Sequence, residues 1–309
     1  MVSEKQKHFG GAIPVLVTPY TDRHAVDPPV VKELAARLAR YDCDGLFVAG
    51  STGDMPFLSI DERVQILKAA REGLPSQTVL YGGIGDFALQ DHWVNARRFA
   101  DVGVDAAVVM APIIFFVINQ SELYEYFRAI ADNSPIPIVL YHHMRVTTPI
   151  EPETVLRLAD HPNIIGMKET GATVDRTYKM LELLGKRDDF FLLQGREAFL
   201  EESYRAGSNG CVAALAGPAP EPFVGMDHCW RDGDEENFKK HLEMVNRLCG
   251  LFDIMPADSF SYFTYMLKKM FEYRSWMDNS RVRTEGFNPP AEYDALIREK
   301  LEELNFPKE

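Results

Sequence analysis

A lysine stands at the end of an apolar run whose other positions fit a strand buried on both faces. The run reads Asn163-Ile164-Ile165-Gly166-Met167-Lys168-Glu169-Thr170. Burying a lysine is costly unless its charge is paired or its amine is used. Desolvation favours the neutral amine, which attacks ketones, and the resulting iminium can accept the electron pair of a neighbouring bond. Lys168 therefore indicates Schiff-base chemistry on a ketone. A rim lysine paired with Glu169 is the structural alternative.

A tyrosine ends the preceding apolar run, Ile138-Val139-Leu140-Tyr141, and two histidines follow it. A phenol at this position can exchange a proton with a carbinolamine or a substrate hydroxyl. The alternative is a core tyrosine with a satisfied hydroxyl group. His142 and His143 are candidate proton relays because imidazole titrates near neutral pH, and their alternative role is to hold the loop by hydrogen bonds.

Three further segments offer groups that could bind an anionic substrate. Gly50-Ser51-Thr52-Gly53-Asp54 makes a tight loop that can present N–H groups and hydroxyls to a carboxylate, although an ordinary turn is the alternative. In Gly195-Arg196-Glu197 the arginine could hold an anionic tail and the glutamate could bind hydroxyls, or the two could form a surface pair. Arg145 is a further candidate for a carboxylate.

The elements that position these residues follow an alternating pattern. Short apolar runs bounded by turn residues are separated by amphipathic helical stretches, which is typical of βα units and a parallel sheet. The runs are Ala12–Val17, Gly45–Ala49, Thr78–Tyr81, Ala106–Met110, Ile136–Tyr141, Ile164–Met167, Phe190–Leu193 and Gly210–Leu215. The first helices between them are expected at Pro29–Tyr41, Asp61–Glu72, Asp91–Val102 and Ser121–Asp132, and Ser59 with Glu62 predicts a capping box.

Eight such units predict a (β/α)8 barrel, in which chemistry sits where the strands end. We expect the catalytic barrel at 1–234 and a helical part packed on it at 235–309, with helices at Asp234–Cys249, Ser259–Tyr273 and Pro290–Leu304. An open doubly wound sheet is the competing arrangement, but no GxGxxG follows the first run to support a dinucleotide site.

Composition excludes several classes of partner. The 309 residues carry 33 Lys+Arg against 46 Asp+Glu, a net charge of −13, which disfavours nucleic acid and anionic membranes. The four cysteines are far apart, so we expect reduced structural thiols and no metal site. The start of the chain lacks an apolar signal segment and no stretch is long enough to span a bilayer, so we expect a soluble, cytoplasmic protein.

Taken in order, four segments resemble the dihydrodipicolinate synthase / N-acetylneuraminate lyase family. They are Gly11-Ala12-Ile13-Pro14-Val15-Leu16-Val17-Thr18-Pro19, the loop 50–54, Val139-Leu140-Tyr141 and Ile164-Ile165-Gly166-Met167-Lys168-Glu169. The resemblance runs from about residue 9 to about 230 and implies a (β/α)8 barrel, usually in a homotetramer built as a dimer of dimers.

The resemblance also implies roles for single residues. Lys168 would form the Schiff base, Tyr141 would transfer protons, and Ser51 and Thr52 would bind the carboxylate of a 2-oxo acid such as pyruvate or relay protons. No metal or nucleotide cofactor is expected.

Two departures separate the chain from the synthases of this family. The family tyrosine after the fourth strand is absent from Ala111-Pro112-Ile113-Ile114-Phe115-Phe116-Val117, and His142-His143-Met144-Arg145 replaces the usual Asn, Pro and Arg-Thr-Gly pattern. We therefore expect an aldolase or dehydratase acting on a 2-oxo-3-deoxy sugar acid or another 4-hydroxy-2-oxo acid. The alternatives are the synthase that condenses pyruvate with aspartate semialdehyde, and a noncatalytic protein that binds 2-oxo acids. A purely structural or protein-interaction role would rest on the aromatic pair Phe115-Phe116. Packing of that pair at a subunit interface is the alternative.

Overall fold

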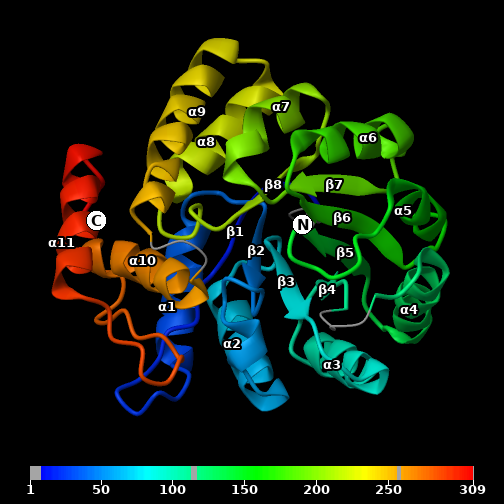
Figure 1. Ribbon diagram of the computed structural model, residues 1–309, viewed down its shortest axis with the longest axis horizontal. Helices are drawn as coiled ribbons and strands as arrows, with labels where there is room; N and C mark the ends of the chain where they lie inside the picture. Colours follow the sequence, from blue (N-terminus) through cyan, green and yellow to red (C-terminus); the bar gives the residue numbers. More distant parts are fainter. Residues whose placement is uncertain (1–7, 113–116, 256–258, 309) are drawn as a thin grey trace, which may run out of the picture.

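Eight parallel strands form the centre of the molecule (Figure 1). The computed structural model describes residues 8–112, 117–255 and 259–308. The strands are β1 (Gly11–Pro14), β2 (Gly45–Val48), β3 (Val79–Ile84), β4 (Ala106–Met110), β5 (Ile138–His143), β6 (Ile164–Thr170), β7 (Phe191–Gln194) and β8 (Gly210–Ala213). All eight predicted runs therefore contain or overlap a strand.

The sheet closes on itself. Neighbouring strands follow the order β1-β8-β7-β6-β5-β4-β3-β2. The two ends meet through a parallel bridge between Val15 and Phe47, where the N–H of Leu16 donates to the carbonyl of Phe47 at 2.9 Å. This closure makes the fold a (β/α)8 barrel, as predicted, and the doubly wound alternative is wrong.

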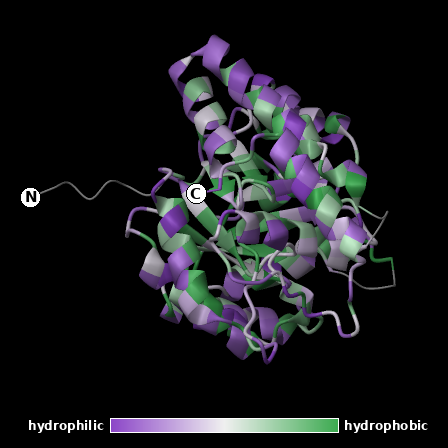
Figure 2. Cartoon of the chain, turned by 90° about the vertical axis from the view of Figure 1, so that its left-hand side faces the viewer, coloured by the Kyte–Doolittle hydropathy of each residue, from purple (hydrophilic) through white to green (hydrophobic). Residues whose placement is uncertain are grey.

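Helices surround the barrel because each presents one apolar face to the strands. The helices between and after the strands are α1 (Pro28–Ala39), α2 (Ile60–Gly73), α3 (Leu89–Asp101), α4 (Gln120–Asn133), α5 (Pro152–Leu158), α6 (Val174–Leu184), α7 (Leu200–Arg205) and α8 (Pro220–Asp232). The predicted capping box is present at α2, since Glu62 N–H donates to Ser59 Oγ and Ser59 N–H donates to the Glu62 carboxylate. Hydrophobic residues gather in the strands and the inward helix faces (Figure 2).

A helical part follows the eighth unit. It contains α9 (Glu235–Cys249), the short 3-10 helix η3 (Phe252–Ile254), α10 (Phe260–Tyr273) and α11 (Ala291–Glu303). Within it α9 packs on α8 and α10 packs on α11. The predicted boundary at residue 234 falls between α8 and α9, and the division into two domains stays a prediction.

Three smaller expectations concern the surroundings of the barrel. The four cysteines are free thiols. No helix in the described part of the chain is long and apolar enough to cross a membrane. Phe115 and Phe116, the pair considered for a subunit interface, lie outside the described residues.

Candidate active site

Lys168 is the innermost charged group of a cavity at the ends of the strands. It lies on β6 beside Tyr141 of β5, with which it is paired in the sheet register. Its side chain is only 4% exposed, and its Nζ lies 4.4 Å from the centroid of the Tyr141 ring and 4.9 Å from that of Phe47. Nζ makes no hydrogen bond or ion pair with any described residue. The amine therefore faces the cavity and is available to a substrate.

Glu169 does not pair with this lysine, so the structural alternative is wrong. Successive side chains of a strand point to opposite faces, and Glu169 therefore leaves the barrel on the outer side. Its carboxylate accepts from Arg176 Nε at 2.9 Å and lies 2.7 Å from His142 Nδ1. The same alternation turns His142 out of the cavity and His143 into it.

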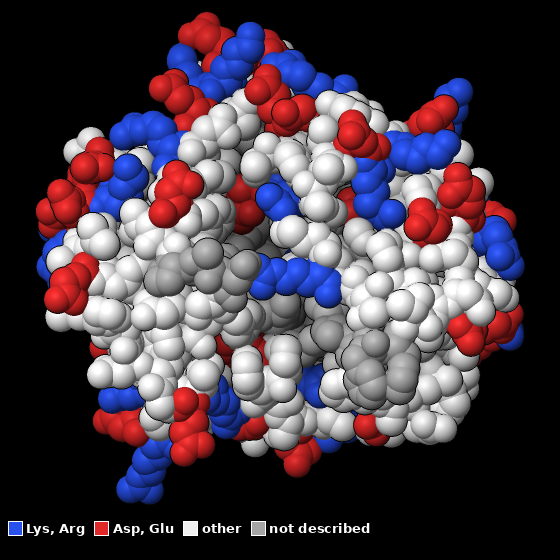
Figure 3. Space-filling view, in the orientation of Figure 1, with Lys and Arg blue, Asp and Glu red and all other residues white. Residues whose placement is uncertain are grey.

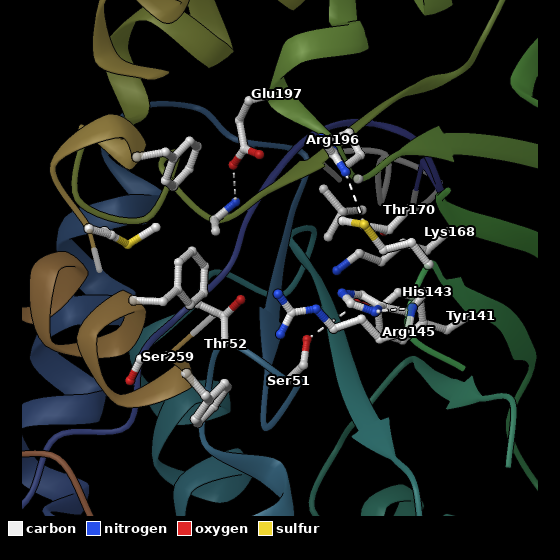
Figure 4. Close-up of a pocket in the computed structure, with 18 residues that line it drawn as sticks. Ser51, Thr52, Tyr141, His143, Arg145, Lys168, Thr170, Arg196, Glu197 and Ser259 are labelled. Atoms are coloured by element: carbon white, nitrogen blue, oxygen red, sulfur yellow. Dashed lines mark hydrogen bonds between the residues drawn. The ribbon is translucent and has the colours of Figure 1, made fainter. Parts of the chain in front are cut away.

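Tyr141 connects the lysine to the loop that follows β2. Its hydroxyl lies 3.2 Å from Ser51 Oγ, and either oxygen can donate (Figure 4). Thr52 also lines the cavity. The N–H groups of Ser51 and Thr52 have no hydrogen-bond partner among the described residues, so they remain available to a carboxylate.

The glycines of this loop shape it and do not face the cavity. A Cβ on Gly50 would lie 2.5 Å from the Phe47 ring, and one on Gly53 would lie 2.9 Å from the carbonyl oxygen of Leu16. Gly50, predicted as a binding residue, is absent from the cavity wall. Its carbonyl closes the turn by accepting from Gly53 and Met55 N–H.

Asp54 ends the loop and anchors it. Its φ of 61° is left-handed, and its carboxylate is buried. Oδ2 accepts from Lys268 Nζ on α10 at 2.9 Å and from the Tyr20 hydroxyl at 3.0 Å. The helical part after the barrel thus holds the Ser51 loop in place through a buried ion pair.

The other predicted binding residues line the same cavity, but not as a surface pair. Arg196 Nη1 contacts Met144 Sδ at 3.1 Å. Glu197 is buried, and its Oε1 accepts the N–H of Ala214 at 2.8 Å and that of Leu215 at 3.2 Å. Burial raises the pKa of the Glu197 carboxyl, and these N–H donors oppose that rise.

Position 195 has no room for a side chain larger than that of glycine. A Cβ there would lie 2.1 Å from Thr170 Oγ1 and 3.0 Å from Lys168 Cε. Its lack of a side chain leaves room for the lysine arm. Thr170 itself was missed by sequence reasoning: it lies two residues after Lys168 on the same face, and its buried Oγ1 has no hydrogen-bond partner among the described residues.

His143 and Arg145 come from the end of β5 and the loop after it, and both line the cavity. The His143 ring meets the Tyr141 ring edge to face, with centroids 6.1 Å apart. Burial, followed by the nearby charges of Lys168 and Arg145, lowers the pKa of His143 from 6.5 to about 4. The imidazole is therefore neutral at physiological pH.

The cavity has a volume of about 520 Å³. It opens in the middle of the face shown in Figure 3, where Lys and Arg side chains lie beside the hollow and most Asp and Glu lie around the outside. A local cationic rim therefore offsets the negative net charge for an anionic substrate. The lining residues that the sequence did not predict are Met144, Thr170, Val212, Ala214, Phe252, Met255, Ser259, Phe260 and Phe263.

One group of side chains in the described part of the chain has a geometry that could suit a metal ion, and it lies elsewhere. Asp44, Asp227 and His228 stand at the opposite end of the barrel, before β2 and in α8. Both carboxylates already pair with Arg231.

Comparison with known proteins gives the same fold and the same family. The family model described as "Dihydrodipicolinate synthetase family" matches residues 8–299. A 4-hydroxy-tetrahydrodipicolinate synthase of Hyphomonas neptunium is 32% identical over 230 residues, which cover 74% of this chain and 78% of that protein. A second protein of that name, from Streptomyces coelicolor, is 33% identical over 228 residues, or 73% of each chain.

Solved structures agree over nearly the whole length. A prophage protein of the dihydrodipicolinic acid synthase family from E. coli K12, solved in complex with pyruvate, has a TM-score of 0.88 at 24% identity and covers 96% of this chain and 99% of that one. A sialic acid aldolase of Ruminococcus gnavus has a TM-score of 0.86 at 18% identity, covering 96% and 97%.

These matches confirm the resemblance inferred from the four sequence segments. The chain belongs to the dihydrodipicolinate synthetase family, whose members are lyases.

Proposed function

We propose that the protein is a Schiff-base lyase that cleaves or dehydrates a 4-hydroxy-2-oxo acid, a class that includes 2-oxo-3-deoxy sugar acids. The observation that carries the proposal is the position of Lys168 in the cavity. Its Nζ has no ion-pair partner among the described residues and lies 4.4 Å from the centroid of the Tyr141 ring, and the Tyr141 hydroxyl contacts Ser51. An amine beside a phenol is the arrangement that imine formation with a ketone requires.

The steps follow from the positions of these groups. The free N–H groups of Ser51 and Thr52 would hold the C1 carboxylate, which brings C2 to Lys168. Lys168 attacks C2, and Tyr141 delivers the proton that lets water leave. The iminium then takes the electron pair of the C3–C4 bond in cleavage. In dehydration it acidifies C3, and the C4 hydroxyl leaves.

The predicted relays have different surroundings. His143 faces the cavity and is neutral because its pKa is about 4, so it can accept a proton from the C4 hydroxyl. His142 is held by Glu169 outside the cavity. We therefore propose His143, and not His142, as the group that supplements Tyr141.

The condensing synthase is a second candidate because the curated relatives bear that name. The segment His142-His143-Met144-Arg145 weakens it, since it departs from the pattern that binds the second substrate's carboxylate. The position of the family tyrosine after β4 falls partly on residues 113–116, outside the described residues. The noncatalytic alternative is weakened by the intact lysine and tyrosine.

One experiment separates the candidates. Purified protein is given a 4-hydroxy-2-oxo acid, and pyruvate release is followed with lactate dehydrogenase and NADH while loss of water is followed by mass spectrometry. A parallel reaction contains pyruvate and aspartate semialdehyde. We expect turnover in the first reaction and its loss in Lys168→Ala. Turnover only in the second would favour the synthase, and none in either would favour the binding protein.

The homotetramer implied by the resemblance also stays a proposal. Light scattering behind size-exclusion chromatography gives the mass of the assembly directly.

A further inference from the structure

The cavity wall opposite Lys168 is aromatic, and it comes from the helical part after the barrel. Phe252 of η3 and Phe260 and Phe263 of α10 line it together with Met255. All four side chains are partly exposed. Side chains from this segment and Lys168 face each other across the cavity (Figure 4). The wall therefore offers unburied apolar surface at the place where the distal half of a substrate would lie.

The rings of this wall pack against one another and against Phe57. The centroids of Phe252 and Phe263 are 6.1 Å apart with planes tilted by 30°, and those of Phe260 and Phe57 are 5.7 Å apart with planes tilted by 36°. These distances lie in the range preferred by aromatic pairs. The apolar surface is thus preformed, which favours an apolar group that can cover it.

Polar groups on this side are few, and Glu197 and Arg196 are each partly engaged by protein atoms. Oε1 of Glu197 already accepts two backbone N–H groups. The guanidinium of Arg196 lies over the Phe199 ring, 5.2 Å from its centroid, and contacts the sulfur of Met144. Among the described residues of η3, α10 and the segment between them, Ser259 is the one that brings a hydroxyl group to the cavity. A chain of sugar hydroxyls placed against this wall would lose hydrogen bonds to water without replacing them.

We propose that the group beyond C4 of the substrate is an aromatic ring, so that cleavage yields pyruvate and an aryl aldehyde. This inference rests on the proposed function and narrows its substrate class away from sugar acids. Lys168 attacks C2 of a 4-aryl-4-hydroxy-2-oxobutanoate and water leaves. The C4 hydroxyl gives up its proton, and the C3–C4 electron pair moves to the iminium to form an enamine as the aldehyde departs. Protonation at C3 and hydrolysis return pyruvate and the free lysine, with no net oxidation.

The test compares two substrates on the wild-type protein. Pyruvate release from 4-hydroxy-2-oxo-4-phenylbutanoate and from a 2-oxo-3-deoxy sugar acid is measured over a range of concentrations. We expect kcat/KM to be at least about tenfold higher for the phenyl substrate, because its ring covers apolar surface in the transition state. Formation of a borohydride-reducible pyruvate adduct on Lys168 is measured in parallel.

Variants locate the effect. Phe263→Ala should lower kcat/KM for the phenyl substrate about tenfold more than for the sugar acid. Phe87→Ala is the matched control, because Phe87 is 84% exposed and outside the cavity, and it should change neither value. Should Phe263→Ala fail to fold by circular dichroism, Phe263→Leu, which keeps bulk and loses the ring, gives the same comparison.

The outcomes separate the two proposals. An adduct together with a preference for the phenyl substrate supports the inference. An adduct together with equal or better cleavage of the sugar acid overturns the inference and leaves the proposed function standing. The absence of an adduct with pyruvate or any larger 2-oxo acid overturns both.

Discussion

The buried pair between Asp54 and Lys268 joins the substrate loop to α10, and it can be broken by one substitution. Lys268 is fully buried, and its Nζ lies 2.9 Å from Asp54 Oδ2. It also donates to the carbonyl of Arg281 at 2.8 Å. Lys268→Met keeps most of the side-chain volume and removes the charge. Among the described residues, the hydroxyl of Tyr20 is then the side-chain donor left to the carboxylate.

The magnitude follows from the geometry of the pair. At 2.9 Å and an effective dielectric of about 20, the two charges attract by about 6 kcal/mol, most of which offsets the cost of their desolvation. Removing the lysine forfeits that attraction while the carboxylate of Asp54 stays buried. We expect the free energy of unfolding to fall by about 3–5 kcal/mol. The double variant Asp54→Asn/Lys268→Met, which buries no charge at this site, should be more stable than Lys268→Met.

Urea unfolding followed by circular dichroism measures these differences. Lys240→Met is the control, since that side chain is 63% exposed in a surface pair, and it should change stability little. Because Asp54 anchors the loop that carries Ser51 and Thr52, Lys268→Met should also raise KM more than it lowers kcat. A loss of less than about 1 kcal/mol, or a double variant no more stable than the single one, would refute this reasoning.

Three further predictions concern the cavity. Tyr141→Phe should lower kcat at least about a hundredfold, because it removes the proton-transfer group, and a kcat near that of wild type would contradict the role. The pKa of His143, about 4 against an ordinary 6.5, is depressed by folding, so its contribution to stability is lost as pH falls through that interval. Urea unfolding at several pH values should show a smaller loss for His143→Gln than for wild type, and equal losses would contradict the assignment. Gly195→Ala places a methyl group 2.1 Å from Thr170 Oγ1 and should abolish most activity. Adding Thr170→Ala should restore part of that activity, and no recovery would contradict the steric explanation.

The barrel and the inner half of the cavity were predictable from the sequence for local reasons. Buried parallel strands are continuous apolar runs, and polar residues at their ends converge on one face of the barrel. Lys168, Tyr141 and the Ser51 loop needed only this rule to be brought together. Deciding which of His142 and His143 faces the cavity requires knowing which residues of β5 point into the barrel. The sequence alone left that open.

The outer half of the cavity depends on contacts between distant parts of the chain. Phe260 and Phe263 are three residues apart on one face of α10, so an aromatic stripe was visible in the sequence. Where that stripe lies depends on contacts such as the pair between Asp54 and Lys268, residues 214 positions apart. No local pattern encodes a contact of that range. Gly195 shows the same limit, because its need for a hydrogen side chain comes from Thr170 on the neighbouring strand.

Trapping of the imine tests the Schiff-base mechanism most directly. The protein is incubated with pyruvate, reduced with borohydride and digested, and the modified peptide is identified by mass spectrometry, with Lys168→Ala treated in the same way. We predict a pyruvate-dependent adduct on Lys168 and none in the variant. An adduct on a different lysine that persists in Lys168→Ala, or no adduct with pyruvate or any larger 2-oxo acid, would contradict the mechanism.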